Sequence, residues 1–219
     1  MSDPNRKSGP TPLIAELAGD LTPVRAITMR DGIVLVLLAF ALAVTGVALV
    51  AGIWSAAMSG TASPYFYIGN GLLLVLGAAS ALAVLAMATP RVGNRHDGPK
   101  WALGMVAVMP LAALVALAGR DSGHGHVPFD GHGVECMVSA LATSLMVGAA
   151  LVAWLRRAAP VTPRLAGMLT GVAATALGSL AYGLSCQLDG VVHIGIWHIA
   201  PVVIGAVAGR YALPPLIRW

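Results

Sequence analysis

Long apolar stretches, separated by short polar ones, dominate the sequence. A helix needs about 20 apolar residues to cross about 30 Å of hydrocarbon. The interval from Asp31 to Arg91 is long enough for two helices, and the polar stretch 58–64 would form the turn between them. Four later intervals between charges hold one helix each. The pattern predicts six spans: Ile33–Trp54, Tyr65–Thr89, Trp101–Ala118, Cys136–Trp154, Leu165–Leu184 and Val191–Gly209.

Composition agrees with this pattern. Hydrophobic residues make up 58% of the 219 residues and charged residues only 10%, and the mean hydropathy is +0.82. Charged residues are about 25% of an ordinary soluble domain, so soluble enzymes and nucleic-acid-binding proteins are excluded. We therefore expect an all-α polytopic membrane protein, a bundle of six transmembrane helices whose lipid partner is the bilayer itself.

The basic residues predict which way the bundle faces. Of the 13 Lys and Arg residues, all but Arg120 fall on one side of the six expected spans. Cytoplasmic loops carry the excess of Lys and Arg. We therefore expect a multi-pass protein of the bacterial inner membrane with both termini cytoplasmic. The expected regions are a cytoplasmic tail (1–31), a transmembrane domain (32–211) and a short cytoplasmic C-terminal tail (212–219).

The expected membrane core lacks Asp, Glu, Lys and Arg. Transporters of charge need such groups, so a charge-coupled transporter is disfavoured. Pro110 and Pro201 lie within spans and predict kinks. His193 and His198 are five residues apart, about 140° around an α-helix, so we do not expect them to hold one cofactor together. No permanent cofactor is expected.

Potential metal ligands gather on the predicted outer side. Thiolate and imidazole are the donors preferred by soft and borderline ions such as zinc, copper and cadmium, which would bind transiently. The spacing matches no established metal motif, and the bland interpretation of the histidines is a polar, glycine-rich loop. The candidate ligands are His124, His126, His132, Cys136, Cys186 and His193.

The two cysteines carry the sharper prediction. Cys136 enters the fourth expected helix and Cys186 follows the fifth, so both lie at similar depth and would meet if these helices are neighbours. In an oxidising periplasm such a pair is a structural disulfide, a redox-sensitive pair or a pair of metal ligands. The sequence does not choose among these three.

The N-terminal segment predicts a short amphipathic helix. Pro12 follows Thr11 as at a helix start, and Leu13, Ile14, Leu17 and Leu21 recur at helical spacing until Pro23. Its charges are balanced, so it is not a nucleic-acid-binding strip. A helix this short needs a surface to pack on, either the membrane interface or a cytoplasmic protein.

Several short segments together resemble the NrsF-like six-span inner-membrane proteins of proteobacteria, over nearly the whole chain. Two features depart from that family: Gln187 stands where proline is expected, and the His-rich outer loop is not general. The segments that carry the resemblance are Leu13–Arg25, Arg156–Pro160, Gly178–Tyr182 with Cys186, Trp197 and Leu216–Trp219.

The resemblance implies a non-enzymatic anti-sigma factor. Its N-terminal segment would sequester an extracytoplasmic-function sigma factor, and two periplasmic cysteines, here Cys136 and Cys186, would respond to heavy-metal or oxidative stress. The alternatives from other classes are a small metal or drug permease and a membrane thiol oxidoreductase. The residues expected to bind the sigma factor are Leu13, Ile14, Leu17, Asp20, Leu21, Pro23, Val24 and Arg25.

Overall fold

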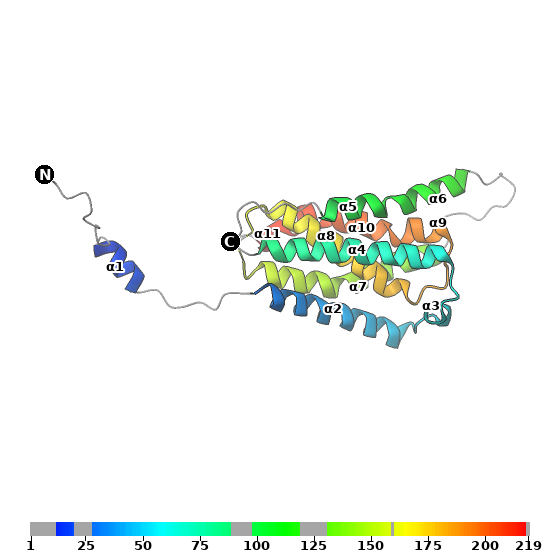
Figure 1. The fold of residues 1–219 in the computed structure, drawn as a ribbon, viewed down its shortest axis with the longest axis horizontal. Helices are drawn as coiled ribbons and strands as arrows, with labels where there is room; N and C mark the ends of the chain where they lie inside the picture. The colour runs from blue at the N-terminus through cyan, green and yellow to red at the C-terminus, as the bar shows by residue number, and fades with distance from the viewer. Residues whose placement is uncertain (1–11, 20–27, 89–97, 119–130, 159, 218–219) are drawn as a thin grey trace.

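The protein is a bundle of roughly parallel and antiparallel helices (Figure 1). The structure is a computed structural model that describes residues 12–19, 28–88, 98–118, 131–158 and 160–217, and all regular elements in these ranges are helical. The all-α prediction is confirmed. In chain order the elements are α1 (Pro12–Gly19), α2 (Met29–Val50), α3 (Ser55–Ser59), α4 (Pro64–Met87), α5 (Gly98–Val106), α6 (Val108–Ala118), α7 (Gly131–Leu155), α8 (Pro163–Gly183), α9 (Val191–His193), the π-helical turn η1 (Ile194–His198), α10 (Ala200–Ala212) and α11 (Pro214–Ile217).

Helix α8 is the centre of the bundle. It packs against α4, α7 and α10, and most of its side chains are buried, including Thr170 and Ser179. The peripheral α2 instead exposes large apolar side chains such as Leu38 and Leu49. Apolar side chains on the outside of a bundle are what a bilayer requires, so the exposed faces agree with a membrane protein.

Glycines four residues apart bring α8 and α10 together, since small residues at this spacing let two helices approach closely. A Cβ on Gly171 would collide with the carbonyl oxygen of Gly205, and one on Gly167 would collide with that of Gly209. The two backbones therefore touch where side chains would normally separate them.

Local signals at the helix ends explain where α2 and α4 begin. Thr28 and Asp31 form a capping box, in which each side chain accepts from the other residue's backbone N–H. This cap starts α2 at Met29, four residues before the expected Ile33. Ser63 caps α4, and Pro64 occupies its first turn, where a missing N–H costs nothing.

The third expected span is two helices in sequence. Pro110 has no N–H to donate to the carbonyl of Val106, and its ring crowds that carbonyl, so α5 ends at Val106 and α6 begins at Val108. Neither is long enough alone to cross a bilayer, so five helices of the described chain meet the length and composition of a span. The two nevertheless run end to end in Figure 1, and the Ala107 and Leu111 N–H groups continue the helical bonding across the break.

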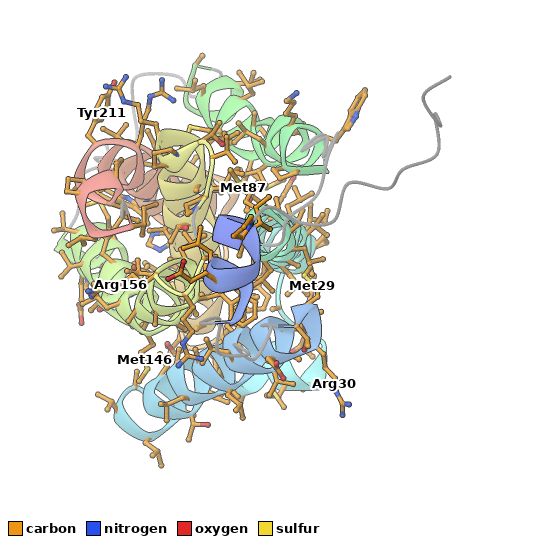
Figure 2. The ribbon with its side chains drawn as sticks, turned by 90° about the vertical axis from the view of Figure 1, so that its left-hand side faces the viewer. Met29, Arg30, Met87, Met146, Arg156 and Tyr211 are labelled. Carbon is orange, nitrogen blue, oxygen red and sulfur yellow. The ribbon has the colours of Figure 1, made fainter. Side chains whose placement is uncertain are left out.

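Basic side chains gather at one end of the bundle. Figure 2 looks onto this end and shows Arg30 at the start of α2 and Arg156 after α7. Lys100 lies in the first turn of α5, Arg164 begins α8 and Arg210 lies near the end of α10. Helix α11 lies at the same end, whereas α3 and α9 lie at the opposite one (Figure 1).

Candidate thiol and imidazole site

Both cysteines lie at the end of the bundle opposite the basic residues. Cys136 is in the second turn of α7, and Cys186 is in the loop that follows α8. The packing of α7 on α8 brings their sulfurs to 3.7 Å, although 50 positions separate them in the chain. The two are not joined by a disulfide, and both are buried. The structure therefore places the two cysteines as neighbours, as their predicted depth suggests.

The loop that carries Cys186 is fixed by its neighbours. The Cys186 N–H donates to the Gly183 carbonyl, which continues the turn at the end of α8, and the Trp54 N–H donates to the Leu184 carbonyl. Ser63 bonds twice to Asp189: its N–H donates to Asp189 Oδ2 at 2.7 Å, and its hydroxyl donates to the Asp189 carbonyl at 2.6 Å. Sequence reasoning did not find the bonds of Trp54 and Ser63 to this loop, because they join residues more than 100 positions apart.

The expectation that His193 and His198 point in different directions is wrong. That expectation assumes α-helical geometry, but Ile194–His198 forms a π-helical turn. The i→i+5 bonding of a π turn brings residues five apart onto the same side of the helix. The two imidazole rings therefore lie edge to face with centroids 5.4 Å apart.

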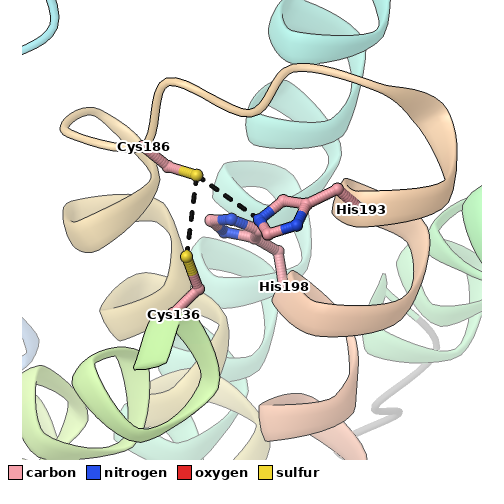
Figure 3. Close-up of side chains that lie close together, drawn as sticks. All are labelled: Cys136, Cys186, His193 and His198. Atoms are coloured by element: carbon pink, nitrogen blue, oxygen red, sulfur yellow. Dashed lines mark hydrogen bonds between the residues drawn. The ribbon is translucent and has the colours of Figure 1, made fainter. Parts of the chain in front are cut away.

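The four side chains converge on one point. Figure 3 shows Cys136, Cys186, His193 and His198 directed toward one another. The Cys186 sulfur lies 3.4 Å from His193 Nε2, and one ligand atom from each residue lies within 4.8 Å of those of the other three. Cys136, Cys186 and His198 are buried, with 6%, 8% and 3% of their surface exposed, and His193 is half-buried.

The surroundings favour a thiolate at Cys186. Its hydrogen bond with Cys136, together with those from His193 and His198, lowers the pKa of the Cys186 thiol well below its ordinary value, although burial acts in the opposite direction. The thiolate is the form of cysteine that binds metals and attacks disulfides. The site therefore has the chemistry both of a metal centre and of a redox-active thiol pair.

The other predicted ligands do not join this group in the described chain. His132 is on the first turn of α7 and is exposed, and it lies outside the group that converges. His124 and His126 lie outside the described residues. His198, which we did not predict as a ligand, takes a place in the group instead.

The predicted sigma-binding segment is described only in its first part. Helix α1 begins at Pro12, as the sequence predicts, and runs to Gly19. Ile14 and Leu17 are on it and are exposed, with 56% and 62% of their surface accessible. The backbone of Leu13 is in α1. Asp20, Leu21, Pro23, Val24 and Arg25 lie outside the described residues.

Comparison with known proteins confirms the resemblance seen in the sequence. Residues 17–219 match the family described as "Negative regulator of sigma F". The chain is 26% identical over 156 residues to the "Probable anti-sigma-F factor NrsF" of Azospira oryzae, which covers 71% of this chain and 73% of that relative. No solved structure matches. Because the family match spans nearly the whole chain, with both cysteines and both converging histidines inside it, this protein belongs to the NrsF family of negative regulators of sigma F.

Proposed function

We propose that this protein is an inner-membrane anti-sigma factor. In the resting state its cytoplasmic N-terminal segment holds an extracytoplasmic-function sigma factor away from RNA polymerase, and ligation of Cys136 and Cys186 by a heavy metal, or their oxidation, releases it. The observation that carries the proposal is the thiol pair itself. Two cysteines far apart in the chain have sulfurs 3.7 Å apart, at the end of the bundle opposite the start of α2.

The arrangement of charges supports this sidedness. The end that carries Arg30, Arg156, Arg164 and Arg210 is the one from which α2 starts, and the positive-inside rule assigns such an end to the cytoplasm. The thiols then face the periplasm. With α5 and α6 counted as one broken span, six crossings return the chain to the cytoplasm.

Helix α1 offers a surface for the sigma factor. Ile14 and Leu17 are three residues apart, so they share one side of the helix, and both are exposed. A helix of 8 residues is marginal alone in water and gains stability when its apolar side packs on a partner.

The first experiment removes the segment. Deleting residues 1–27, and no further, preserves the Thr28–Asp31 cap of α2. We expect sigma-dependent transcription to rise to the level of a strain that lacks this protein, while a membrane-fraction blot shows the truncated chain still inserted. Leu17→Asp alone should relieve repression partly, and Glu16→Gln on the same helix should not. Unchanged repression by the truncated chain would refute sequestration by this segment.

The second experiment removes the thiols. Cys136→Ser and Cys186→Ser should leave basal repression intact and abolish induction by cadmium or by a thiol oxidant, measured with the same transcriptional reporter. Ser185→Ala is a suitable control, because the Ser185 hydroxyl bonds locally to the Tyr182 carbonyl and the change leaves both thiols in place. Normal induction in the double serine variant would contradict the sensing role.

A further inference from the structure

Two separations between donor atoms of this group match those of a tetrahedral metal ion of zinc size, and all four donor atoms lie within 4.8 Å of one another. With Zn–S bonds of about 2.3 Å and Zn–N bonds of about 2.0–2.1 Å, tetrahedral angles place two sulfurs about 3.8 Å apart and a sulfur and a nitrogen about 3.6 Å apart. In the structure the two sulfurs are 3.7 Å apart, and Cys186 Sγ is 3.4 Å from His193 Nε2. A disulfide would instead require about 2.05 Å, so the thiols stand at the distance of co-ligands.

The burial of the group indicates a closed site. Three of the four residues are buried, and His198 Nε2 is a buried ring nitrogen without a hydrogen-bond partner among the described residues. Buried polar atoms are nearly always paired, and an exception calls for an ion or a water. The group supplies two sulfurs and two nitrogens, the Cys₂His₂ set of four-coordinate zinc sites that leave no open position.

The total charge of the four donors favours a divalent ion. Two thiolates and two neutral imidazoles carry a total charge of −2, so a divalent ion makes the buried site neutral. A monovalent ion would leave a net charge in a poorly solvated place, which is costly. Calcium and magnesium need oxygen donors, and none of these four ligand atoms is an oxygen.

The π turn brings the two histidine ligands, His193 and His198, together. Pro201 has no N–H to donate to the carbonyl of Trp197, so the α-helical ladder is interrupted at this point, and η1 takes the i→i+5 pattern just before α10. This pattern is what places His193 beside His198. In a continuous α-helix the two rings would diverge by about 140°.

We propose that Cys136, Cys186, His193 and His198 form a closed tetrahedral site for a divalent metal ion of zinc size, with the π turn holding both histidines in place. The inference rests on the proposed function in that it names the ligand class of the same thiol pair. Both cysteines bind the ion as thiolates, and any proton that they or the imidazoles hold in the metal-free site is released to solvent, so binding involves no oxidation.

The test is a titration of the full-length, reduced protein in detergent with Co²⁺ alone, which reports zinc-type coordination by its absorption. We expect one ion per chain, a thiolate-to-cobalt charge-transfer band in the near ultraviolet and the intense visible bands of a tetrahedral complex. Added Zn²⁺ should displace the cobalt. A reduced, monodisperse protein that gives no charge-transfer band would overturn the proposal.

Histidine variants test the imidazole ligands. His193→Gln and His198→Gln should keep a thiolate band, lose the tetrahedral visible bands, and weaken Co²⁺ binding by more than the roughly 10–100-fold that outer-shell changes cause. His132→Gln is the matched control, since this exposed histidine lies on the same helix as Cys136 but outside the group. Wild-type spectra in both variants would overturn the assignment. His193 is half-buried, so its variant keeps the test decisive if His198→Gln does not fold.

The two proposals fail separately. A chain that co-purifies with a sigma factor but binds no Co²⁺ in the reduced state contradicts the metal site and leaves the anti-sigma function standing. A chain that gives the expected spectrum but retains no sigma factor contradicts the anti-sigma function and leaves the metal site standing.

Discussion

At the scale of single residues, the contact between α8 and α10 depends on the absence of side chains. Gly205 faces Thr175 so closely that an added Cβ would lie 2.5 Å from Thr175 Cγ2 and 2.7 Å from the Gly171 carbonyl oxygen. Neither α8 nor its partner can yield locally, because the backbones themselves are in contact. A methyl group at this position must push the helices apart.

We therefore expect Gly205→Ala to destabilise the bundle. Overpacking of a tight interface costs about 1–3 kcal/mol, which exceeds the roughly 0.5–1 kcal/mol that alanine gains over glycine within a helix. Gly148→Ala on α7 is the control, because its Cβ would meet Ala174 Cβ at an ordinary 3.5 Å. Thermal unfolding in detergent should show a lower midpoint for Gly205→Ala than for the wild type, and no decrease for Gly148→Ala. Equal midpoints would mean that the helices separate at little cost.

The candidate ligands also show, residue by residue, what the sequence could predict. Cys136, Cys186 and His193 follow from helix periodicity and depth, since each sits at the same end of a span. The sequence does not predict His198 as a partner of His193, because a regular α-helix turns the two residues about 140° apart. The signal that could have found it is Pro201, whose missing N–H breaks that regularity three residues later. Periodicity assumes the helix that such a proline interrupts.

At the scale of elements, the segment from α9 to α10 combines two roles. It is long and apolar enough to span a membrane, and its outer part is the π turn that carries His198 next to His193. Single π turns within α-helices are frequent at functional sites. Here the turn departs from α-helical hydrogen bonding, and this departure places the two imidazoles side by side.

A backbone N–H at position 201 tests whether Pro201 causes this π turn. In Pro201→Ala the new N–H can bond to the Trp197 carbonyl, which favours α-helical bonding across the turn and rotates His193 away from His198. We expect weaker Co²⁺ binding, measured by titration, in a protein that still inserts and elutes as the wild type does. Pro214→Ala, a buried proline at the start of α11, should bind normally. Wild-type Co²⁺ affinity in Pro201→Ala would show that other contacts fix the turn.

The broken third span shows the same limit of sequence reasoning. The apolar stretch from Trp101 to Ala118 predicts one helix, and Pro110 within it predicts a kink, but the pattern does not say whether the proline bends the helix or divides it. The contacts around the break are also absent from the pattern: Gly195 lets η1 approach α6 so closely that an added Cβ would lie 2.7 Å from the Met109 carbonyl oxygen. The hydrophobic periodicity of the sequence carries no information on such contacts between distant segments.

At the scale of the whole molecule, the two kinds of chemistry lie at opposite ends of one bundle. His193 ends α9 and Cys186 is in the loop before it, at the end of the bundle where α3 also lies (Figure 1). The start of α2 and the basic residues Arg30 and Arg156 lie at the other end (Figure 2). The central α8 runs between the two ends: it ends three residues before Cys186 and begins beside Arg164. If the two ends are coupled, α8 is the helix that connects them, because α4, α7 and α10 all pack on it.

Such a relay must work in both directions. If a metal ion weakens sigma binding by some factor, thermodynamic linkage requires the sigma factor to weaken metal binding by the same factor, commonly about 5–150-fold. We expect Co²⁺ titration of the sigma-bound protein to give a dissociation constant raised within this range over that of the free protein. The sigma factor should lose affinity by an equal factor when the ion is present.

The truncated chain that begins at Thr28 provides the control for this last measurement. It keeps the cap of α2 and all four candidate ligands but lacks the segment expected to hold the sigma factor. Adding the sigma factor should therefore leave its Co²⁺ affinity unchanged. If the full-length chain also binds Co²⁺ equally well with and without the sigma factor, the two ends are energetically independent, and metal binding at the thiols cannot be the signal that releases it.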